Sequence, residues 1–143
     1  MRNLPISTEM INTHARVEMV DVTDLVQKHV RKAAVSDGFV IVYNPHTSSA
    51  VTINENADPD VKSDLLMKLE KLVPQIESYY QHDEGNSDAH VKTALLGNSV
   101  TILIEGGRLV LGRWQGIYFC EFDGPREREL FVKLVDFKPR TDG

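Results

Sequence analysis

Apolar side chains at helical spacing predict a first helix within residues 21–38, "DVTDLVQKHVRKAAVSDG". Asp21 is placed to cap its start, with Asp24 three residues on in the capping-box position. Gly38 suits its C-terminal end. The apolar face of this helix is expected to consist of Leu25, Val26, Val30, Ala33 and Ala34.

The helical spacing of apolar residues is clearest in residues 58–74, "DPDVKSDLLMKLEKLVP", where they recur at steps of four, four and three. Asp58 is the expected N-cap, Pro59 the first helical residue and Pro74 the stop. Ser87 is expected to cap a third, shorter helix over "DAHVKTALL", which ends before Gly97.

The rest of the chain favours strands, because it contains short runs of β-branched and aromatic residues between turn signals. Gly106 and Gly107 predict a hairpin turn between two of these runs. We therefore expect one α+β domain over residues 1–143, with two or three helices on an antiparallel, mixed or barrel-like sheet. The expected extended segments are 4–10, 14–20, 39–45, 50–55, 100–104, 108–112, 116–122 and 129–137.

Composition narrows the possible functions. The 143 residues carry a formal net charge of −5, which argues against binding of bulk nucleic acid. No apolar run approaches the ~18 residues that span a bilayer, and the first residues lack the long apolar segment of a secretory signal. Cys120 is the only cysteine, so an internal disulfide is excluded. We expect a cytoplasmic protein without membrane contact.

Polar residues gather in four stretches, and histidines mark two of them. His46, His82 and His90 are candidate metal ligands, since three imidazoles with a water form a common catalytic zinc arrangement. Glu84, Asp88 or Glu121 would complete the ligand set. The spacing matches no compact helical pair such as H-E-x-x-H, so solvated surface histidines or helix caps are the alternative. The four stretches are 44–60, 82–92, 112–118 and 121–129.

Hydroxyl and guanidinium groups suggest an anion site. Thr47, Ser48 and Ser49 follow Pro45 in a turn that can receive an oxyanion, although a plain Ser/Thr-rich turn explains them equally. Arg126 and Arg128 follow a turn at 123–125 and match phosphate oxygens. A solvated hairpin with Arg–Glu pairs is the alternative for them. Further candidates for anion or substrate binding are Asn86, Lys92, Arg113 and Gln115.

Trp114 lies between two glycines and could stack on a flat heterocycle, but packing in the core or at a subunit interface is the commoner use of tryptophan.

Taken together, "PHTSSAVTINENADPDV", "YYQHDEGNSDAHVKTALLG" and "GRLVLGRWQGIYFCEFDGPRER" closely resemble the YjbQ-like family, also called the secondary thiamine-phosphate synthase family. The resemblance covers residues 23–137. It implies a compact α+β fold, a homotrimer, and sites at or near subunit boundaries. The family motifs fall on His46, His82, His90, Trp114, Gln115, Glu121, Asp123, Gly124, Pro125 and Arg126.

The resemblance implies coupling of a pyrimidine diphosphate to a thiazole phosphate with release of pyrophosphate. Under this hypothesis His82, His90, Glu121 and Arg126 are catalytic, and the histidines hold a divalent metal. Histidine ligands favour a zinc-like ion, whereas pyrophosphate-releasing enzymes usually hold Mg²⁺ through carboxylates. The alternatives are a metal-dependent hydrolase of a small phosphorylated or carboxylated metabolite, and a non-catalytic trimer that binds an anion or metabolite.

Overall fold

Two antiparallel sheets form the body of the protein in the computed structural model, which describes residues 1–138. The large sheet has the order β1-β9-β4-β6-β7, and β2 also pairs with β9. The small sheet has the order β3-β8-β5. The strands of the large sheet are β1 (Arg2–Asn3), β2 (Ser7–Asn12), β4 (Asp37–Tyr43), β6 (Ser99–Glu105), β7 (Arg108–Leu109) and β9 (Glu127–Asp136). Those of the small sheet are β3 (Glu18–Asp21), β5 (Ser49–Glu55) and β8 (Gln115–Glu121). The predicted α+β class is confirmed, and both sheets are antiparallel throughout.

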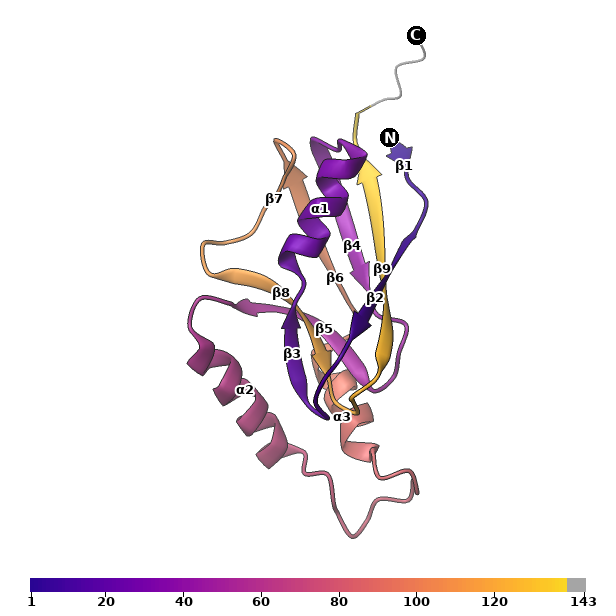
Figure 1. The fold of residues 1–143 in the computed structure, drawn as a ribbon, viewed down its shortest axis with the longest axis vertical. Helices are drawn as coiled ribbons and strands as arrows, with labels where there is room; N and C mark the ends of the chain where they lie inside the picture. Colours follow the sequence, from indigo (N-terminus) through magenta and orange to yellow (C-terminus); the bar gives the residue numbers. More distant parts are fainter. Residues whose placement is uncertain (139–143) are drawn as a thin grey trace.

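Helix α1 (Thr23–Ala33) lies over one face of the large sheet (Figure 1). Its predicted apolar face is confirmed where Val26 and Val30 are fully buried against the sheet. Asp21 accepts hydrogen bonds from the backbone and hydroxyl of Thr23, but the N-cap itself is Val22. The helix therefore begins one residue later than the capping-box pattern predicts.

The predicted helix end at Gly38 is wrong. The helix stops at Ala33, and Ala34 takes the left-handed conformation with φ 54°. Gly38 lies inside β4, opposite Asp136 of β9, where an added Cβ would stand 2.0 Å from the carbonyl oxygen of Val135. A glycine is needed here by the close approach of another strand, and not by a turn.

The second and third helices, α2 (Pro59–Leu72) and α3 (Ser87–Leu96), match their predicted positions. The Asp58 side chain accepts from the backbone N–H of Asp60, which confirms the predicted cap. Ser87 is the first helical residue of α3, and the N-cap is Asn86. Figure 1 shows α2 along one side of the molecule, with the segment before α3 looping out at the end opposite the termini.

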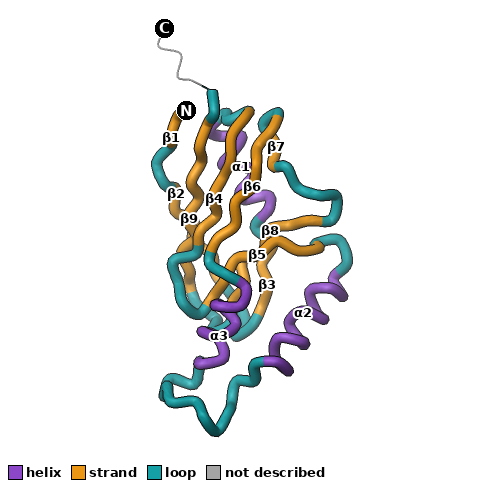
Figure 2. Tube along the Cα trace, turned by 180° about the vertical axis from the view of Figure 1, so that it is seen from behind, coloured by secondary structure: helices purple, strands orange, loops and turns teal. Residues whose placement is uncertain are grey.

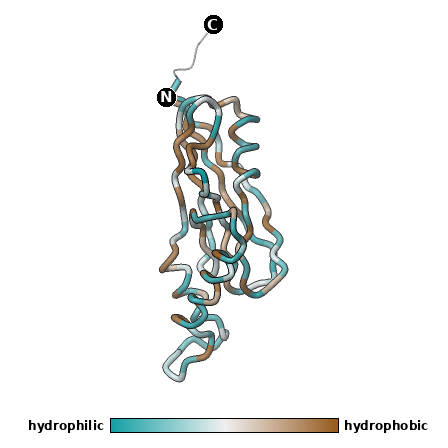
Figure 3. Tube along the Cα trace, turned by 90° about the vertical axis from the view of Figure 1, so that its left-hand side faces the viewer, coloured by the Kyte–Doolittle hydropathy of each residue, from teal (hydrophilic) through white to brown (hydrophobic). Residues whose placement is uncertain are grey.

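The main core lies between the large sheet, α1 and the small sheet. Alternate residues of the central strands point into it, as the period of two in β4 and β6 requires. In Figure 3 the hydrophobic stretches gather in these strands. A second cluster around Tyr118, Cys120 and Phe122 receives Leu65, Leu66 and Leu69 from α2. The opposite face of the large sheet has no helix over it, as Figure 2 shows.

The Gly106–Gly107 turn is confirmed, with positive φ at both glycines and β6 paired to β7. The strand that follows is shorter than the predicted 108–112 and ends at Leu109. None of the helices within residues 1–138 has the length and apolar character needed to cross a bilayer.

Candidate functional site

A polar pocket of about 370 Å³ opens where the loop after β4, the start of α3 and the start of β9 meet. It brings together eight of the residues that the sequence suggests for metal, anion or catalytic chemistry. Its lining is formed by Pro45, His46, Thr47, Ser48, Glu84, Asn86, His90, Arg126 and Arg128.

Asparagine side chains hold the loop that carries His46. The side chain of Asn44 is fully buried, donates to the carbonyl of Ser49 and accepts from the backbone N–H of His46 at 3.2 Å. Asn98 donates to the carbonyls of Asn44 and His46. The Ser49 hydroxyl donates to Asn44, which turns it into the loop and away from the pocket lining.

Arg126 forms an outer wall of the pocket. Its Nη2 donates to Asp123 Oδ2 at 2.9 Å and its Nε donates to the Asp123 carbonyl at 3.0 Å. Asn86 Nδ2 donates to the same carboxylate oxygen at 2.8 Å, which joins the start of α3 to the 123–126 turn. About half of the Arg126 side chain is exposed, so this ion pair contributes little to stability.

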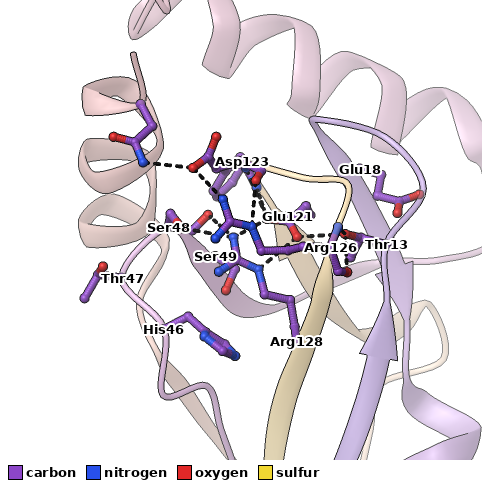
Figure 4. Close-up of polar contacts among 12 residues, drawn as sticks. Thr13, Glu18, His46, Thr47, Ser48, Ser49, Glu121, Asp123, Arg126 and Arg128 are labelled. Carbon is purple, nitrogen blue, oxygen red and sulfur yellow. Dashed lines mark hydrogen bonds and ion pairs between the residues drawn. The ribbon is translucent and has the colours of Figure 1, made fainter. Parts of the chain in front are cut away.

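Arg128 lies behind Arg126 and is buried together with Glu121. Figure 4 shows the two arginine side chains beside each other, with Ser48 and His46 nearby. Arg128 Nε donates to Glu121 Oε1 at 2.9 Å, and its Nη2 donates to Glu121 Oε2 and to the Ser48 hydroxyl. Burial acts to raise the pKa of Glu121, but hydrogen bonds from Arg128 and Thr13 outweigh it and hold that pKa below its usual value.

Both arginines were predicted to belong to one candidate anion site, and only Arg126 was predicted to be catalytic. The strand pattern contains a signal for Arg128, because 128, 130, 132 and 134 alternate in phase and all are buried in β9. A charged residue in the inward phase of a strand is either paired or used by a site.

The three histidines lie in two different settings. His46 Nε2 accepts from the backbone N–H of Glu129 at 2.8 Å, and burial together with the nearby charge of Arg128 lowers the pKa of His46. His90 Nδ1 is 2.9 Å from the carbonyl of Thr47 and must donate to it, which leaves its Nε2 without the proton in the neutral ring. His82 packs edge-on to His90 with 5.6 Å between ring centroids.

These positions do not join the three rings into one ligand set within a single chain. Among residues 1–138, no three His, Cys, Asp or Glu side chains converge closely enough to hold one ion. His82 instead stands 3.4 Å from Glu84, on the exposed segment before α3. His46 already uses its Nε2 for the backbone of β9.

Lys92 lies outside the pocket lining, within a buried ionic network on α3. Its Nζ is 2.9 Å from both Asp88 and Glu70, and Asp88 also accepts from Arg16. The ammonium group of Lys92 is thus paired with two carboxylates. The network connects α2 and the β2–β3 loop to α3.

Arg113 and Gln115 are also placed apart from the pocket. Gln115 begins β8 and Glu121 ends it, so the two are separated by about 20 Å at the rise of an extended strand. The Gln115 side chain accepts from the backbone N–H of Gly112, and Arg113 stacks on the half-exposed Trp114 ring at 4.7 Å. Within residues 1–138, none of the residues at this end of β8 is among those that line the pocket.

Comparison with known proteins places the chain in one family. The family model described as "UPF0047 protein YjbQ-like" matches residues 7–136. UPF0047 protein YugU of Bacillus subtilis is 45% identical over 130 residues, covering 91% of this chain and 98% of the relative. UPF0047 protein MJ1081 of Methanocaldococcus jannaschii is 48% identical over 128 residues, covering 90% and 92%.

Solved structures agree with the sequence comparison. An uncharacterized conserved protein of the YjbQ/UPF0047 family from Clostridium acetobutylicum superposes with a TM-score of 0.88 at 50% identity, covering 90% of this chain and 99% of that one. The hypothetical protein APE1520 of Aeropyrum pernix K1 gives a TM-score of 0.87 at 32% identity, covering 93% and 99%. The resemblance inferred from the motifs is confirmed, and the chain belongs to the UPF0047, YjbQ-like family.

Proposed function

We propose that the pocket binds the phosphate or pyrophosphate group of a small phosphorylated metabolite. The observation that supports this most is the convergence of two arginines, two loop hydroxyls and the N-terminal cap of α3 on one volume of about 370 Å³. Guanidinium groups match phosphate oxygens, and a helix N-terminus favours an anion. Each arginine is also paired with a carboxylate, so directed N–H donors matter more here than net positive charge.

The reaction that we propose is the coupling of a pyrimidine diphosphate to a thiazole phosphate. The thiazole nitrogen attacks the methylene carbon of the pyrimidine, the carbon–oxygen bond breaks, and pyrophosphate leaves with the bonding electrons. The protein must stabilise the negative charge that grows on the departing oxygens. Arg126 and Arg128, with the hydroxyls of Thr47 and Ser48, are the groups that we assign to this task.

Incubation of the purified protein with both precursors, followed by chromatography of thiamine phosphate, tests the coupling. Wild-type protein and Arg113→Ala should form product at similar rates, because Arg113 is outside the pocket lining. Arg126→Ala and His90→Ala should form much less. Product at the level of a protein-free control would refute the synthase proposal.

The His82–His90 pair beside Glu84 favours a second candidate, a metal-dependent hydrolase of a small phosphorylated or carboxylated metabolite. Imidazole nitrogens suit zinc-like ions better than Mg²⁺. Within residues 1–138 the donors of one chain fall short of the three or four that a zinc site requires, so the ion would need a further ligand, such as water or a second copy of the chain.

Elemental analysis separates these possibilities. If the pair holds a zinc-like ion, His82→Ala and His90→Ala should each lower the metal content of the purified protein, while His14→Ala, at an exposed position, should not. Turnover of a phosphate-ester panel that depends on this metal, without thiamine precursors, would favour the hydrolase. Binding of pyrophosphate without turnover of any substrate would favour a non-catalytic metabolite-binding protein.

We also propose that the chain forms a homotrimer in the cytoplasm. The uncovered face of the large sheet supports assembly, because it exposes Tyr43, Leu103 and Phe137. Tyr43 stacks on Phe131, next to the β9 residues that border the pocket, so a second copy on this face would approach the site. Light scattering after size exclusion should give three chains per particle for wild type and for Lys28→Asp, and fewer for Leu103→Asp.

A further inference from the structure

The guanidinium group of Arg128 is held from one side only. An arginine carries five N–H donors in a planar fork. Its Nε and Nη2 donate to the two carboxylate oxygens of Glu121, and Nη2 also donates to the hydroxyl and carbonyl oxygens of Ser48. These contacts fix the plane of the fork and leave the two N–H groups of Nη1.

The remaining donors of Arg128 are on Nη1, and Arg128 is one of the residues that line the pocket. Within residues 1–138, no hydrogen bond from Nη1 is present, and the buried side-chain atoms that lack a partner are Asn86 Oδ1 and Thr93 Oγ1. The Nη1 atom is therefore still in contact with solvent, although the residue as a whole is only 2% exposed. Because Arg128 lines the pocket, Nη1 is the donor group that we assign to a ligand there.

Arg126 differs from Arg128 in its exposure. Its Nε and Nη2 are likewise bound to one acid, Asp123, but its side chain is 48% exposed, whereas that of Arg128 is 3% exposed. An anion that recruits Arg126 competes with solvent for the guanidinium, whereas one that meets Arg128 finds donors that are already oriented by buried partners. Pre-oriented donors bind with less loss of conformational entropy.

Glu121 accepts more hydrogen bonds than an acid–base group can retain while it exchanges a proton. Besides Arg128, it accepts from the Thr13 hydroxyl at 2.8 Å and from the backbone N–H groups of Phe122 and Asp123 at 3.1 Å. The carboxylate is fully buried beneath the arginine. Its geometry suits holding the guanidinium in place, not proton transfer to a substrate.

We infer that Arg128 is the fixed anion-binding residue of the pocket, and that Glu121 is a positioning residue acting through it. This inference rests on the proposed binding of a phosphorylated ligand and specifies which residues recognise it. It reassigns Glu121, which the sequence suggested as catalytic, to a supporting position behind the donor.

Calorimetric titration of the full-length protein with inorganic pyrophosphate provides the test. Arg128→Lys should weaken binding by at least about tenfold, because a charge-assisted hydrogen bond in a fixed fork is lost. Arg113→Lys, outside the pocket lining, is the control and should change the dissociation constant by no more than about threefold. Arg126→Lys should weaken binding less than Arg128→Lys does, because an exposed cation contributes less than a buried one. Circular dichroism spectra confirm that each variant is folded at the titration temperature.

A double-mutant cycle separates positioning from general structural support. Glu121→Gln should weaken pyrophosphate binding in the wild-type background and add nothing in the Arg128→Lys background. Equal weakening in both backgrounds would show that Glu121 does not act through Arg128. If Glu121→Gln does not fold, Thr13→Val withdraws one donor from the same carboxylate and takes its place in the cycle.

The outcomes distinguish the inference from the proposed function. Wild-type protein that binds no pyrophosphate overturns the anion pocket itself. Wild-type protein that binds pyrophosphate, with Arg128→Lys binding equally well, retains the pocket and overturns the assignment of Arg128. A larger loss in Arg126→Lys than in Arg128→Lys would transfer the assignment to Arg126.

Discussion

Replacing Asp88 by asparagine should strongly destabilise the protein, because this carboxylate neutralises two cations at once. Its side chain is fully buried, with Lys92 Nζ at 2.9 Å and Arg16 Nη2 at 2.9 Å. Asparagine keeps the volume and removes the charge. Lys92 is 1% exposed and would then rely on Glu70 alone.

The size of the effect follows from these exposures. Removing one partner of a buried ion pair typically costs about 3–5 kcal/mol, because the other charge stays buried. Arg16 can reach solvent and Lys92 retains Glu70, so the lower end applies. We expect a loss of about 3 kcal/mol in the free energy of unfolding, or about 10 °C in Tm for a chain of this length.

The pH dependence of this loss provides a second check. Burial acts to raise the pKa of Asp88, but hydrogen bonds and charge from Arg16 and Lys92 lower it overall. A carboxyl group whose pKa falls on folding adds stability above its unfolded pKa, and that stability is lost as the pH falls through the folded pKa. The difference between wild type and Asp88→Asn should therefore be largest near neutral pH and shrink below about pH 4.

Urea denaturation at fixed protein concentration measures both effects. Asp64→Asn, at an exposed position of α2, is the matched control and should change stability by less than about 0.5 kcal/mol. Adding Lys92→Met to Asp88→Asn should recover part of the loss, since the uncompensated cation is removed. If Asp88→Asn alone costs under 1 kcal/mol, or costs the same at pH 3 as at pH 7, the ionic network is not what holds this region.

Three further predictions concern single residues. Gly38→Ala should lower the free energy of unfolding, measured in urea, by about 3 kcal/mol, because its Cβ would stand 2.0 Å from the Val135 carbonyl oxygen. Gly112→Ala meets only a flexible side chain and should cost under about 1 kcal/mol. Equal costs would contradict the close approach of β9 to Gly38. Burial raises the pKa of Cys120 to about 12, so its thiol should resist alkylation at pH 8 until denaturant is added, and rapid labelling of folded protein would contradict its burial. The pKa of His46 is lowered, first by burial and then by the charge of a neighbouring arginine. Its NMR titration midpoint should therefore lie below 6.5, and its contribution to stability should fall as the pH drops below that value; a midpoint at or above 6.5 would contradict this environment.

Local sequence signals predict most of the elements because each signal acts within a few residues of chain. The Asp58 cap, the Pro59 start and the Gly106–Gly107 turn depend on neighbours that the sequence lists in order, and all three are present as predicted. The motif resemblance extends this to the fold class, since it compares many positions at once. Local signals could not predict the position of Gly38, because the need for a glycine there comes from the backbone of Val135, almost a hundred residues away in the sequence.

The candidate site was predictable only to the level of its segments. His46, His90 and Arg126 come from three separate polar stretches, and the fold brings them to one pocket. The same reasoning also selected Lys92 and Arg113, because a side chain's charge says nothing about the partners that occupy it. Lys92 is held by two carboxylates, and Arg113 is about a strand's length away.

Arg128 shows what separates a charged residue in a site from one that is merely solvated. In "PRERELFVKL" its neighbours Glu127 and Glu129 suggest a surface of alternating charge, and the exposed phase of β9 fits that reading. The inward-facing residues of β9 do not fit a solvated surface, because Arg128 is followed on that face by Leu130 and Val132, which are buried. A buried guanidinium requires an anion, and Glu121 supplies one on the side away from the pocket. The alternation that seemed to mark a solvated hairpin therefore places one buried cation in the lining of the candidate site, where we infer that its Nη1 donors meet a ligand.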